Sequence, residues 1–273
     1  MNSALISEGS TLVKELCEKH NVTPIYIAFH GSQAYGYAKE TSDNDILFIY
    51  KRPLKDYFRT DSLPTEIKHS ELDVKGWDIQ KFLSILVKDG WNAHEALHCP
   101  NITFGNSSEE LIHKILEFAN VQINCNKIAR TMICCASRDF DKADTNDNVR
   151  KLKYFLSSSR MILSTLHLLR YETYPPISYD RLVKTCLRGN LLDEYKIFGD
   201  NEFTLRTLQM FKAARTSNNE DLIDIDMLNA FIINFKEIHY KLIEEVKTLK
   251  FKEVSEETKE KANSLLQEYI LEN

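Results

Sequence analysis

Two carboxylates stand at alternate positions just before an apolar run near the start of the chain. Ser42-Asp43-Asn44-Asp45 lead into the segment DILFIY (45–50), whose β-branched and aromatic composition predicts a buried strand. Side chains two residues apart in a strand project from the same face, so Asp43 and Asp45 are expected to point at one spot. Adjacent carboxylates repel each other unless a divalent cation neutralises them. The spacing therefore predicts a site for Mg²⁺ or Mn²⁺.

A third carboxylate and a glycine–serine turn extend this candidate site. Asp73 lies in LDVKGW (72–77), a predicted neighbouring strand, and Gly31-Ser32 follow another predicted strand, IYIAF. The N–H groups of such a turn, together with the serine hydroxyl, can bind a phosphate. Three acidic groups beside a phosphate-binding turn suit two-metal phosphoryl chemistry. Asp78 is an alternative third carboxylate, although its place just ahead of the apolar helix pattern IQKFLSILVK favours a helix N-cap.

Apolar periodicity predicts an α+β protein, with a small sheet and flanking helices followed by an all-helical region. An amphipathic helix is expected over residues 5–20, before the first strand. After the third strand the pattern is helical to the end of the chain. Beyond the helix that follows Asp78, the predicted helices span residues 91–98, 108–118, 121–137, 148–171, 178–188, 203–215, 225–250 and 256–271. The change in pattern predicts two domains, a catalytic domain over residues 1–105 and a helical domain over residues 106–273.

The order of these motifs resembles the polymerase-β-like nucleotidyltransferase superfamily, whose pattern is GS…(S)DxD followed by an apolar strand. The segment GSQAYGYAKETSDND is similar to the GSxAYG…SDxD block of the predicted nucleotidyltransferases linked to RNA repair. LDVKGWDIQKFLSILVKDGWNAHEALHCP resembles that family's D-x-x-GWD region, and RKLKYFLSSSRMILSTLHLLRYETYPP resembles its helix before a proline pair. The chain departs from the family at Gln33, where Arg is expected, and at Leu47-Phe48, where Arg-Gly is expected. Neither departure removes a metal ligand.

The resemblance implies an enzyme in which an acceptor hydroxyl attacks the α-phosphorus of an NTP and pyrophosphate leaves. Asp43 and Asp45 would be magnesium ligands. Asp73 would contact a second metal and act as the base for the acceptor hydroxyl. Gly31 and Ser32 would hold the β- and γ-phosphates of the nucleotide.

Basic residues of the helical region bear on the identity of the acceptor. The net charge of −5 excludes a uniformly basic nucleic-acid-binding protein. Residues 126–215 nevertheless hold 16 basic and 10 acidic residues, whereas the rest of the chain holds 19 and 30. Lys153 and Arg160 lie two turns apart on one face of the predicted helix 148–171, and they are candidate contacts to a nucleotide or RNA phosphate. The resemblance to RNA-repair-linked nucleotidyltransferases implies an RNA (tRNA-like) end as the acceptor, and these basic residues are an independent reason to expect it.

Two further hypotheses share the same motifs. In the first, the enzyme nucleotidylates a protein Tyr or Ser instead of an RNA end. In the second, the fold is catalytically silent and serves as a binding module. The intact set of Asp43, Asp45 and Asp73 argues against the silent module.

A competing motif lies at residues 94–98, where HEALH has the H-E-x-x-H pattern of zinc proteases. On a helix His94 and His98 would share a face, and Glu95 would act as a base. Pro100 ends the predicted helix almost at once, and the sequence offers no evident third ligand. Because the nucleotidyltransferase-like pattern already accounts for Glu95 and Pro100, the protease is the weaker hypothesis.

Length and composition set wider limits on the class of protein. The 273 residues suffice for about two domains of ~100–200 residues each. The six cysteines show no CxxC spacing and are expected to be reduced thiols. The sequence shows no signal peptide, and no apolar run approaches the ~18–20 residues that span a bilayer. These features predict a cytoplasmic protein without a membrane partner and leave its oligomeric state open.

Overall fold

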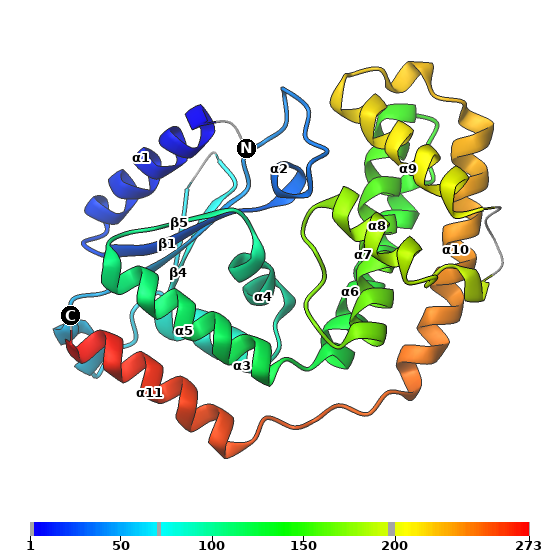
Figure 1. Ribbon diagram of the computed structural model, residues 1–273. Helices are drawn as coiled ribbons and strands as arrows, with labels where there is room; N and C mark the ends of the chain where they lie inside the picture. Colours follow the sequence, from blue (N-terminus) through cyan, green and yellow to red (C-terminus); the bar gives the residue numbers. More distant parts are fainter. Residues whose placement is uncertain (1–2, 70–71, 196–199, 273) are drawn as a thin grey trace. The chain divides into compact units, whose positions relative to one another are not determined.

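The computed structural model describes residues 3–69, 72–195 and 200–272, and the chain folds into two compact units (Figure 1). The first unit contains a sheet with its covering helices and is formed by Met1–Ala34, Asp43–Ile123 and Glu253–Asn273. The second unit is helical and is formed by Tyr35–Ser42 and Asn124–Lys252. The segment Tyr35–Ser42, which joins the glycine–serine turn to Asp43, therefore belongs to the helical unit.

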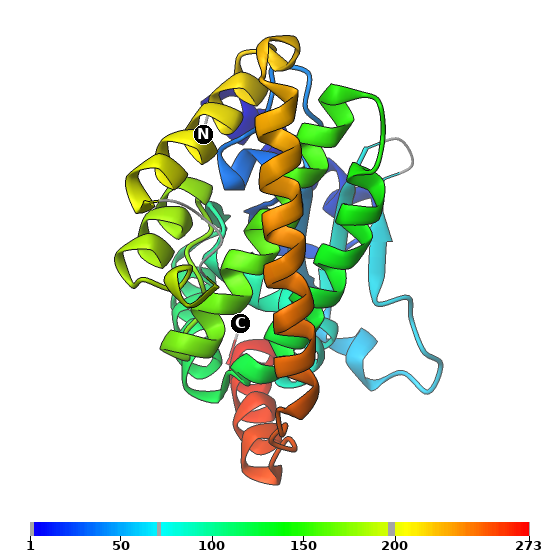
Figure 2. The same cartoon turned by 90° about the vertical axis from the view of Figure 1, so that its right-hand side faces the viewer.

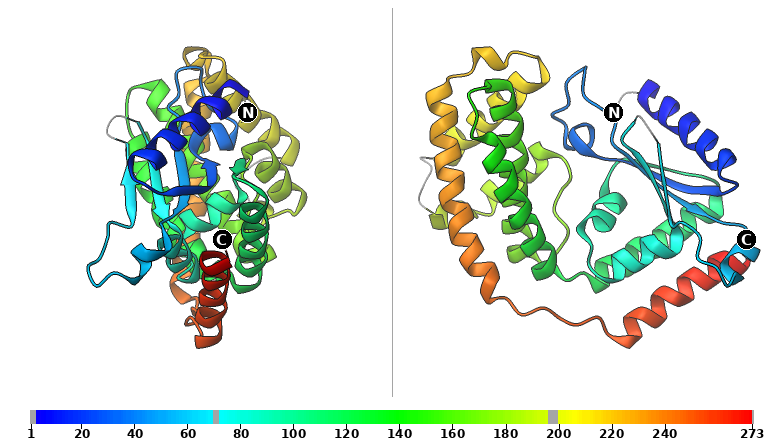
Figure 3. Two further views of the ribbon diagram at one scale, coloured as in Figure 1. Left: turned by 90° about the vertical axis from the view of Figure 1, so that its left-hand side faces the viewer. Right: turned by 180° about the vertical axis from the view of Figure 1, so that it is seen from behind.

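A five-stranded mixed sheet forms the centre of the first unit (Figure 3). Its strands are β1 (Thr23–Phe29), β2 (Ile46–Lys51), β3 (Glu66–Lys68), β4 (Val74–Asp78) and β5 (Asn101–Thr103). Their order across the sheet is β3-β4-β2-β1-β5. Strands β2 and β4 are parallel, whereas the β1–β2, β1–β5 and β3–β4 pairs are antiparallel. The starts of β2 and β4 therefore lie at the same edge of the sheet, beside the end of β1.

Helices cover both faces of the sheet, and this explains why its central strands are apolar without alternation. On one face lies α1 (Ser3–Lys19), and on the other lie α3 (Ile79–Val87), α4 (Trp91–His98) and α5 (Asn106–Gln122) (Figure 1). The last helix, α11 (Glu256–Glu272), packs beside α3 and α5. Strand β2 is buried at five consecutive positions. Continuous burial is expected for a strand that is covered on both faces.

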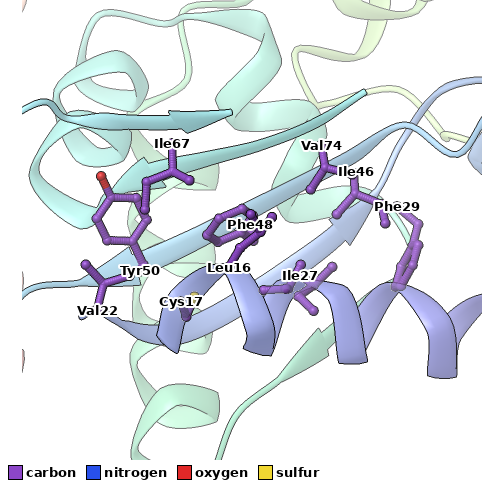
Figure 4. Close-up of a cluster of buried hydrophobic side chains, with 11 residues drawn as sticks. Leu16, Cys17, Val22, Ile27, Phe29, Ile46, Phe48, Tyr50, Ile67 and Val74 are labelled. Carbon is purple, nitrogen blue, oxygen red and sulfur yellow. The ribbon is translucent and has the colours of Figure 1, made fainter. Parts of the chain in front are cut away.

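Apolar side chains of α1 and of the strands form a core on the face of the sheet that α1 covers (Figure 4). Its members are Val13, Leu16, Cys17, Val22, Ile27, Phe29, Ile46, Phe48, Tyr50, Ile67 and Val74. Full burial of one large apolar side chain contributes about 1.5–3 kcal/mol. This core holds in place the strands whose ends carry the candidate site.

The second unit is built around α7 (Asn148–Tyr171), which is buried along most of its length. Figure 2 gives a second view of the helices of this unit, with the helix of residues 225–248 in orange. Its neighbours are α6 (Cys125–Ala143), α8 (Tyr179–Arg188), α9 (Asn201–Thr216) and α10 (Ile225–Thr248). Four of these five helices begin with a side-chain cap, from Asn124, Asp147, Asp200 and Asp224. Each cap accepts a hydrogen bond from an otherwise unpaired N–H group of the first turn. Three short 3₁₀ helices complete the described elements, at Leu54–Phe58, Asp193–Tyr195 and Glu220–Leu222.

The predicted α+β class is confirmed, and the differences concern short elements and packing partners. The prediction missed α2 (Gly31–Tyr35) and the strands β3 and β5, because elements of three to five residues are too short to show a period. Helices α5 and α11 belong to the first unit, so the chain divides differently from the predicted boundary between residues 105 and 106. An amphipathic pattern shows which side of a helix is buried but not what covers it.

In the described ranges, none of the helices has the length and apolar character that crossing a membrane requires. All six cysteines are free thiols.

Candidate active site

Three strand ends meet at the edge of the sheet where the candidate carboxylates lie. Parallel pairing of β2 with β4 sets Ile46 opposite Val74, so the residues just before them, Asp45 and Asp73, are neighbours. The Ile46 N–H donates to the Asp73 carbonyl at 3.0 Å, and the N–H of His30, at the end of β1, donates to the Asp45 carbonyl at 2.8 Å. The backbone thereby fixes two of the three predicted carboxylates side by side.

The electrostatics of this edge show an excess of negative charge. The pKa of Asp45 is raised from 3.8 to about 6, chiefly by burial and then by the hydrogen bond and charge of Asp73. The pKa of Asp73 is lowered, first by its hydrogen bond from Lys75, whose Nζ lies 2.9 Å from the carboxylate. Asp45 thus keeps its proton to a higher pH than an ordinary aspartate, beside an Asp73 that ionises more readily. A divalent cation would relieve the same repulsion without a proton.

Asp43 is exposed and lies in the irregular segment before β2. Its charge also raises the pKa of Asp45, so the two residues belong to one electrostatic group. The strand begins at Ile46, so Asp43 and Asp45 precede it rather than alternate within it. Within the described residues, no three Asp, Glu, His or Cys side chains are already arranged as a metal site. The donor chemistry fits Mg²⁺ or Mn²⁺ nevertheless, because all three candidate groups are carboxylates.

Position 31 requires glycine, in part because of the Asp45 carboxylate beside it. It begins α2 with φ +65°, and a Cβ atom there would lie 1.7 Å from Oδ2 of Asp45. Glycine is therefore needed both for the backbone conformation and for the space that Asp45 occupies. Ser32, the next residue, is half-buried in the first turn of α2.

The two alternatives for the third carboxylate lie in different surroundings. Asp78 is the last residue of β4, at the opposite end of the strand from Asp73, and is 2% exposed. Its carboxylate caps α3 by accepting the Gln80 N–H at 2.9 Å, and it also accepts the Tyr57 hydroxyl at 3.2 Å. Asp78 therefore serves as the predicted N-cap, whereas Asp73 adjoins Asp45.

The two candidate cations of α7 differ in their surroundings. Lys153 is exposed, but Arg160 is 2% exposed. The Arg160 guanidinium lies over the Tyr35 ring, 3.6 Å from its centroid. Both residues belong to the helical unit. Periodicity placed them on one face of a helix but gave no sign that one of them is buried.

The HEALH residues form part of the interior of the sheet unit. His94 is 1% exposed and Glu95 is 3% exposed. The pKa of His94 is lowered to about 3 by burial and by the nearby His98, whose Nδ1 lies 2.8 Å from the His94 carbonyl. Burial at this level gives no support to a catalytic zinc site, which must keep a coordination position open to water or substrate.

Glu95 instead connects α4 to the edge of the sheet. Its Oε2 lies 3.6 Å from Nδ1 of His30, and Sγ of Cys99 lies 3.9 Å from the same nitrogen. A protonated His30 would lower the pKa of both Asp45 and Asp73. This group was not predicted, because nothing in the sequence shows that residues 30 and 95 are neighbours.

Comparison with known proteins identifies the family of the chain. The chain matches the family described as the RNA repair pathway DNA polymerase beta family (RlaP) over residues 7–234, and it belongs to that family. It is also 25% identical over 230 residues to the uncharacterized protein YcgL of Bacillus subtilis (strain 168), with 81% of each chain covered. The predicted kinship with polymerase-β-like, RNA-repair-associated nucleotidyltransferases is thus confirmed.

Proposed function

We propose that the protein is a magnesium-dependent nucleotidyltransferase that moves an NMP from an NTP to a hydroxyl at an RNA end. The observation that carries the proposal is the contact between Asp45 and Asp73 at the starts of two parallel strands, with the pKa of Asp45 raised to about 6. Membership of an RNA repair family supports the class of reaction. Enzymes of this type generally use divalent metals.

Each group at the sheet edge has a role in this proposal. Asp43 and Asp45, with Asp73, would hold the divalent cations, which supply charge stabilisation to the phosphates when bound. Asp73 accepts the proton of the acceptor hydroxyl. The hydroxyl oxygen then forms a bond to the α-phosphorus. The bond between the α-phosphorus and the oxygen that bridges to the β-phosphate breaks, and pyrophosphate leaves. Catalysis rests on positioning and electrostatics rather than on a covalent enzyme intermediate.

Gly31 and Ser32, at the start of α2, are proposed to hold the nucleotide phosphates. Lys153 is an exposed candidate for a contact to a nucleotide or RNA phosphate. Arg160 is the weaker candidate for such a contact, because its guanidinium is buried against the Tyr35 ring. The basic balance of residues 126–215 supports an RNA acceptor. We place the enzyme in the cytoplasm, in keeping with its free thiols.

Labelled NTPs offered with Mg²⁺ and either total RNA or total protein test the proposal. Label on RNA, abolished by Asp45→Asn, is the expected result. Label on protein would move the function to protein nucleotidylation with the same site. Label on neither, across all four NTPs, would contradict the enzymatic role. RNA binding should also weaken as salt increases, because each neutralised phosphate releases counterions.

A further inference from the structure

The segment Tyr35–Ser42 connects the two parts of the candidate site, and all of its contacts described below lie within the helical unit. It begins three residues after Ser32 and ends directly before Asp43. Tyr35 and Tyr37 are 9% and 5% exposed, on either side of Gly36 with φ +81°. The rest of the segment is half-buried or exposed, so it is held at particular side chains, as a surface loop can be, rather than buried throughout.

Aromatic contacts hold the first half of this segment. The guanidinium of Arg160 lies 3.6 Å from the centroid of the Tyr35 ring. The Tyr37 ring meets the Tyr179 ring edge-on at 5.9 Å, and the Tyr179 hydroxyl lies 2.9 Å from Oγ of Ser159. These contacts account for the Tyr-Gly-Tyr sequence between the two motifs of the site.

A buried ionic cluster holds the second half. The Lys39 ammonium pairs with the Glu220 carboxylate, which also accepts a hydrogen bond from Nη1 of Arg215 at 3.0 Å. Glu220 is 3% exposed, and Lys39 and Arg215 are also mostly buried. Burial alone would raise the pKa of Glu220, but the hydrogen bonds from Lys39 and Arg215 outweigh it and lower the pKa. Removal of one member would leave a buried charge without full compensation.

The ionic cluster is coupled to Asp43 by one tight turn. The Lys39 N–H donates to Oγ of Ser42 at 2.8 Å, and the Ser42 N–H donates to the Lys39 carbonyl at 3.1 Å. Ser42 is bonded directly to Asp43. Two hydrogen bonds thus close the turn Lys39–Ser42, so a shift of Lys39 is expected to move Ser42 and the Asp43 backbone attached to it.

We propose that Glu220 is a positioning residue for Asp43, acting through Lys39 and the turn that ends at Ser42. The inference rests on the proposed function, because it assumes that Asp43 is a metal ligand. Asp43 is exposed and precedes β2, so the sheet alone gives it little support. The helical unit supplies that support from a residue 177 positions later in the chain.

Mn²⁺ binding and amide hydrogen exchange test this role in the full-length protein. Mn²⁺ affinity is measured by titration with detection by electron paramagnetic resonance, in the absence of nucleotide. Glu220→Gln should raise the Mn²⁺ dissociation constant about tenfold, the lower end of effects seen when groups behind metal ligands are removed. The same variant should exchange the amides of residues 36–42 faster than the wild type.

Two further variants sharpen the test. Lys39→Met leaves the Arg215–Glu220 pair intact and should weaken Mn²⁺ binding similarly, even if Glu220→Gln fails to fold. Lys39→Arg keeps the charge and should restore most of the affinity. Asp139→Asn is the matched control, because this carboxylate of the helical unit accepts a hydrogen bond from Ser157 and is not tied to the loop.

The outcomes separate this inference from the proposed function. Faster exchange with unchanged Mn²⁺ affinity in both Glu220→Gln and Lys39→Met would make the cluster purely structural and overturn the positioning role. Unchanged exchange and affinity in both variants would also overturn it. Wild-type protein that binds no Mn²⁺ would contradict the metal site itself, and with it both proposals.

Discussion

The sheet-edge carboxylates and the HEALH motif use similar residue types within one compact unit, but their exposure differs. Asp43 and Asp73 are exposed and Asp45 is half-buried, whereas His94 and Glu95 are almost completely buried. The sheet-edge carboxylates repel one another, so the binding of a cation between them would be favourable. In the HEALH motif, burial instead favours the neutral form of His94, and Glu95 is paired with His30.

The backbone explains this difference. Asp45 and Asp73 lie directly before the starts of two parallel strands, where the pairing of Ile46 with Val74 brings two separate chain segments together at the edge of the sheet. HEALH lies on an eight-residue helix that is buried at five consecutive positions. A short motif can therefore form a catalytic or metal site only where the fold brings its side chains together at an accessible position.

The largest expected effect is on nucleotidyl transfer, which should depend on the sheet-edge carboxylates and not on the HEALH motif. Asp43→Asn and Asp45→Asn should each reduce nucleotidyl transfer by about a thousandfold, because each removes several kcal/mol of charge stabilisation of the transition state. Glu95→Gln should leave most of the transfer. Steady-state assays with labelled NTP measure both, and circular dichroism checks the fold. Asp61→Asn serves as control, because Asp61 is exposed and paired with Arg59 away from the strand ends. Near-normal turnover in both active-site variants would show that the site is misassigned.

A second prediction tests the packing of Asp45 against the glycine turn. Gly31→Ala should destabilise the protein by more than the ~1–3 kcal/mol typical of a strained backbone position, because its Cβ must also displace Oδ2 of Asp45. The variant should lose transfer activity as well. Gly105→Ala is the matched control: Gly105 has φ +83°, and no atom lies within 4 Å of the added Cβ. Denaturant titration gives the stabilities, and equal loss of activity in both variants would refute the steric argument.

A third prediction concerns pH, where the two groups should act with opposite sign in the metal-free protein. The folded pKa of Asp45, about 6, lies above its ordinary 3.8, so its contribution to stability is present below pH 3.8 and is lost as pH rises to 6. The folded pKa of His94, about 3, lies below its ordinary 6.5, so its contribution is present above pH 6.5 and is lost as pH falls towards 3.

Thermal melts between pH 4 and pH 7 measure these contributions. Asp45→Asn should gain stability relative to the wild type at pH 7 but not at pH 4, and His94→Gln should flatten the loss of stability at acid pH. Added Mg²⁺ should stabilise the wild type at pH 7 and have little effect on Asp45→Asn. Parallel pH profiles for all three proteins would contradict the different environments of the two groups.

The smallest expected effect is on zinc. The purified protein should hold no stoichiometric zinc, and His94→Ala should leave its metal content unchanged, because His94 and Glu95 are enclosed in the interior. Elemental analysis after dialysis against a trace of zinc measures this. One zinc per chain that disappears in His94→Ala would restore the protease hypothesis.

Much of the fold and of the candidate site was predictable from local patterns. The apolar run after Asp45, the strand after Asp73 and the cap at Asp78 each depend on residues within a few positions of one another. Such patterns reflect periodicity and capping, which are properties of the chain segment itself. The order of the motifs was enough to predict the family, which the match over residues 7–234 confirms.

Other features were decided by the tertiary structure, because they join residues far apart in the sequence. From the sequence alone, Asp73 and Asp78 were both candidates for the third carboxylate. In the structure they lie at opposite ends of β4, Asp73 beside Asp45 and Asp78 at the start of α3. Periodicity placed Arg160 on the same helix face as Lys153, but the packing of Arg160 against Tyr35 buries it. The partnerships of Glu95 with His30 and of Glu220 with Lys39 arise only when distant segments fold together. A local pattern determines which side chains share a face, whereas burial and charge pairing depend on what the rest of the chain places against that face.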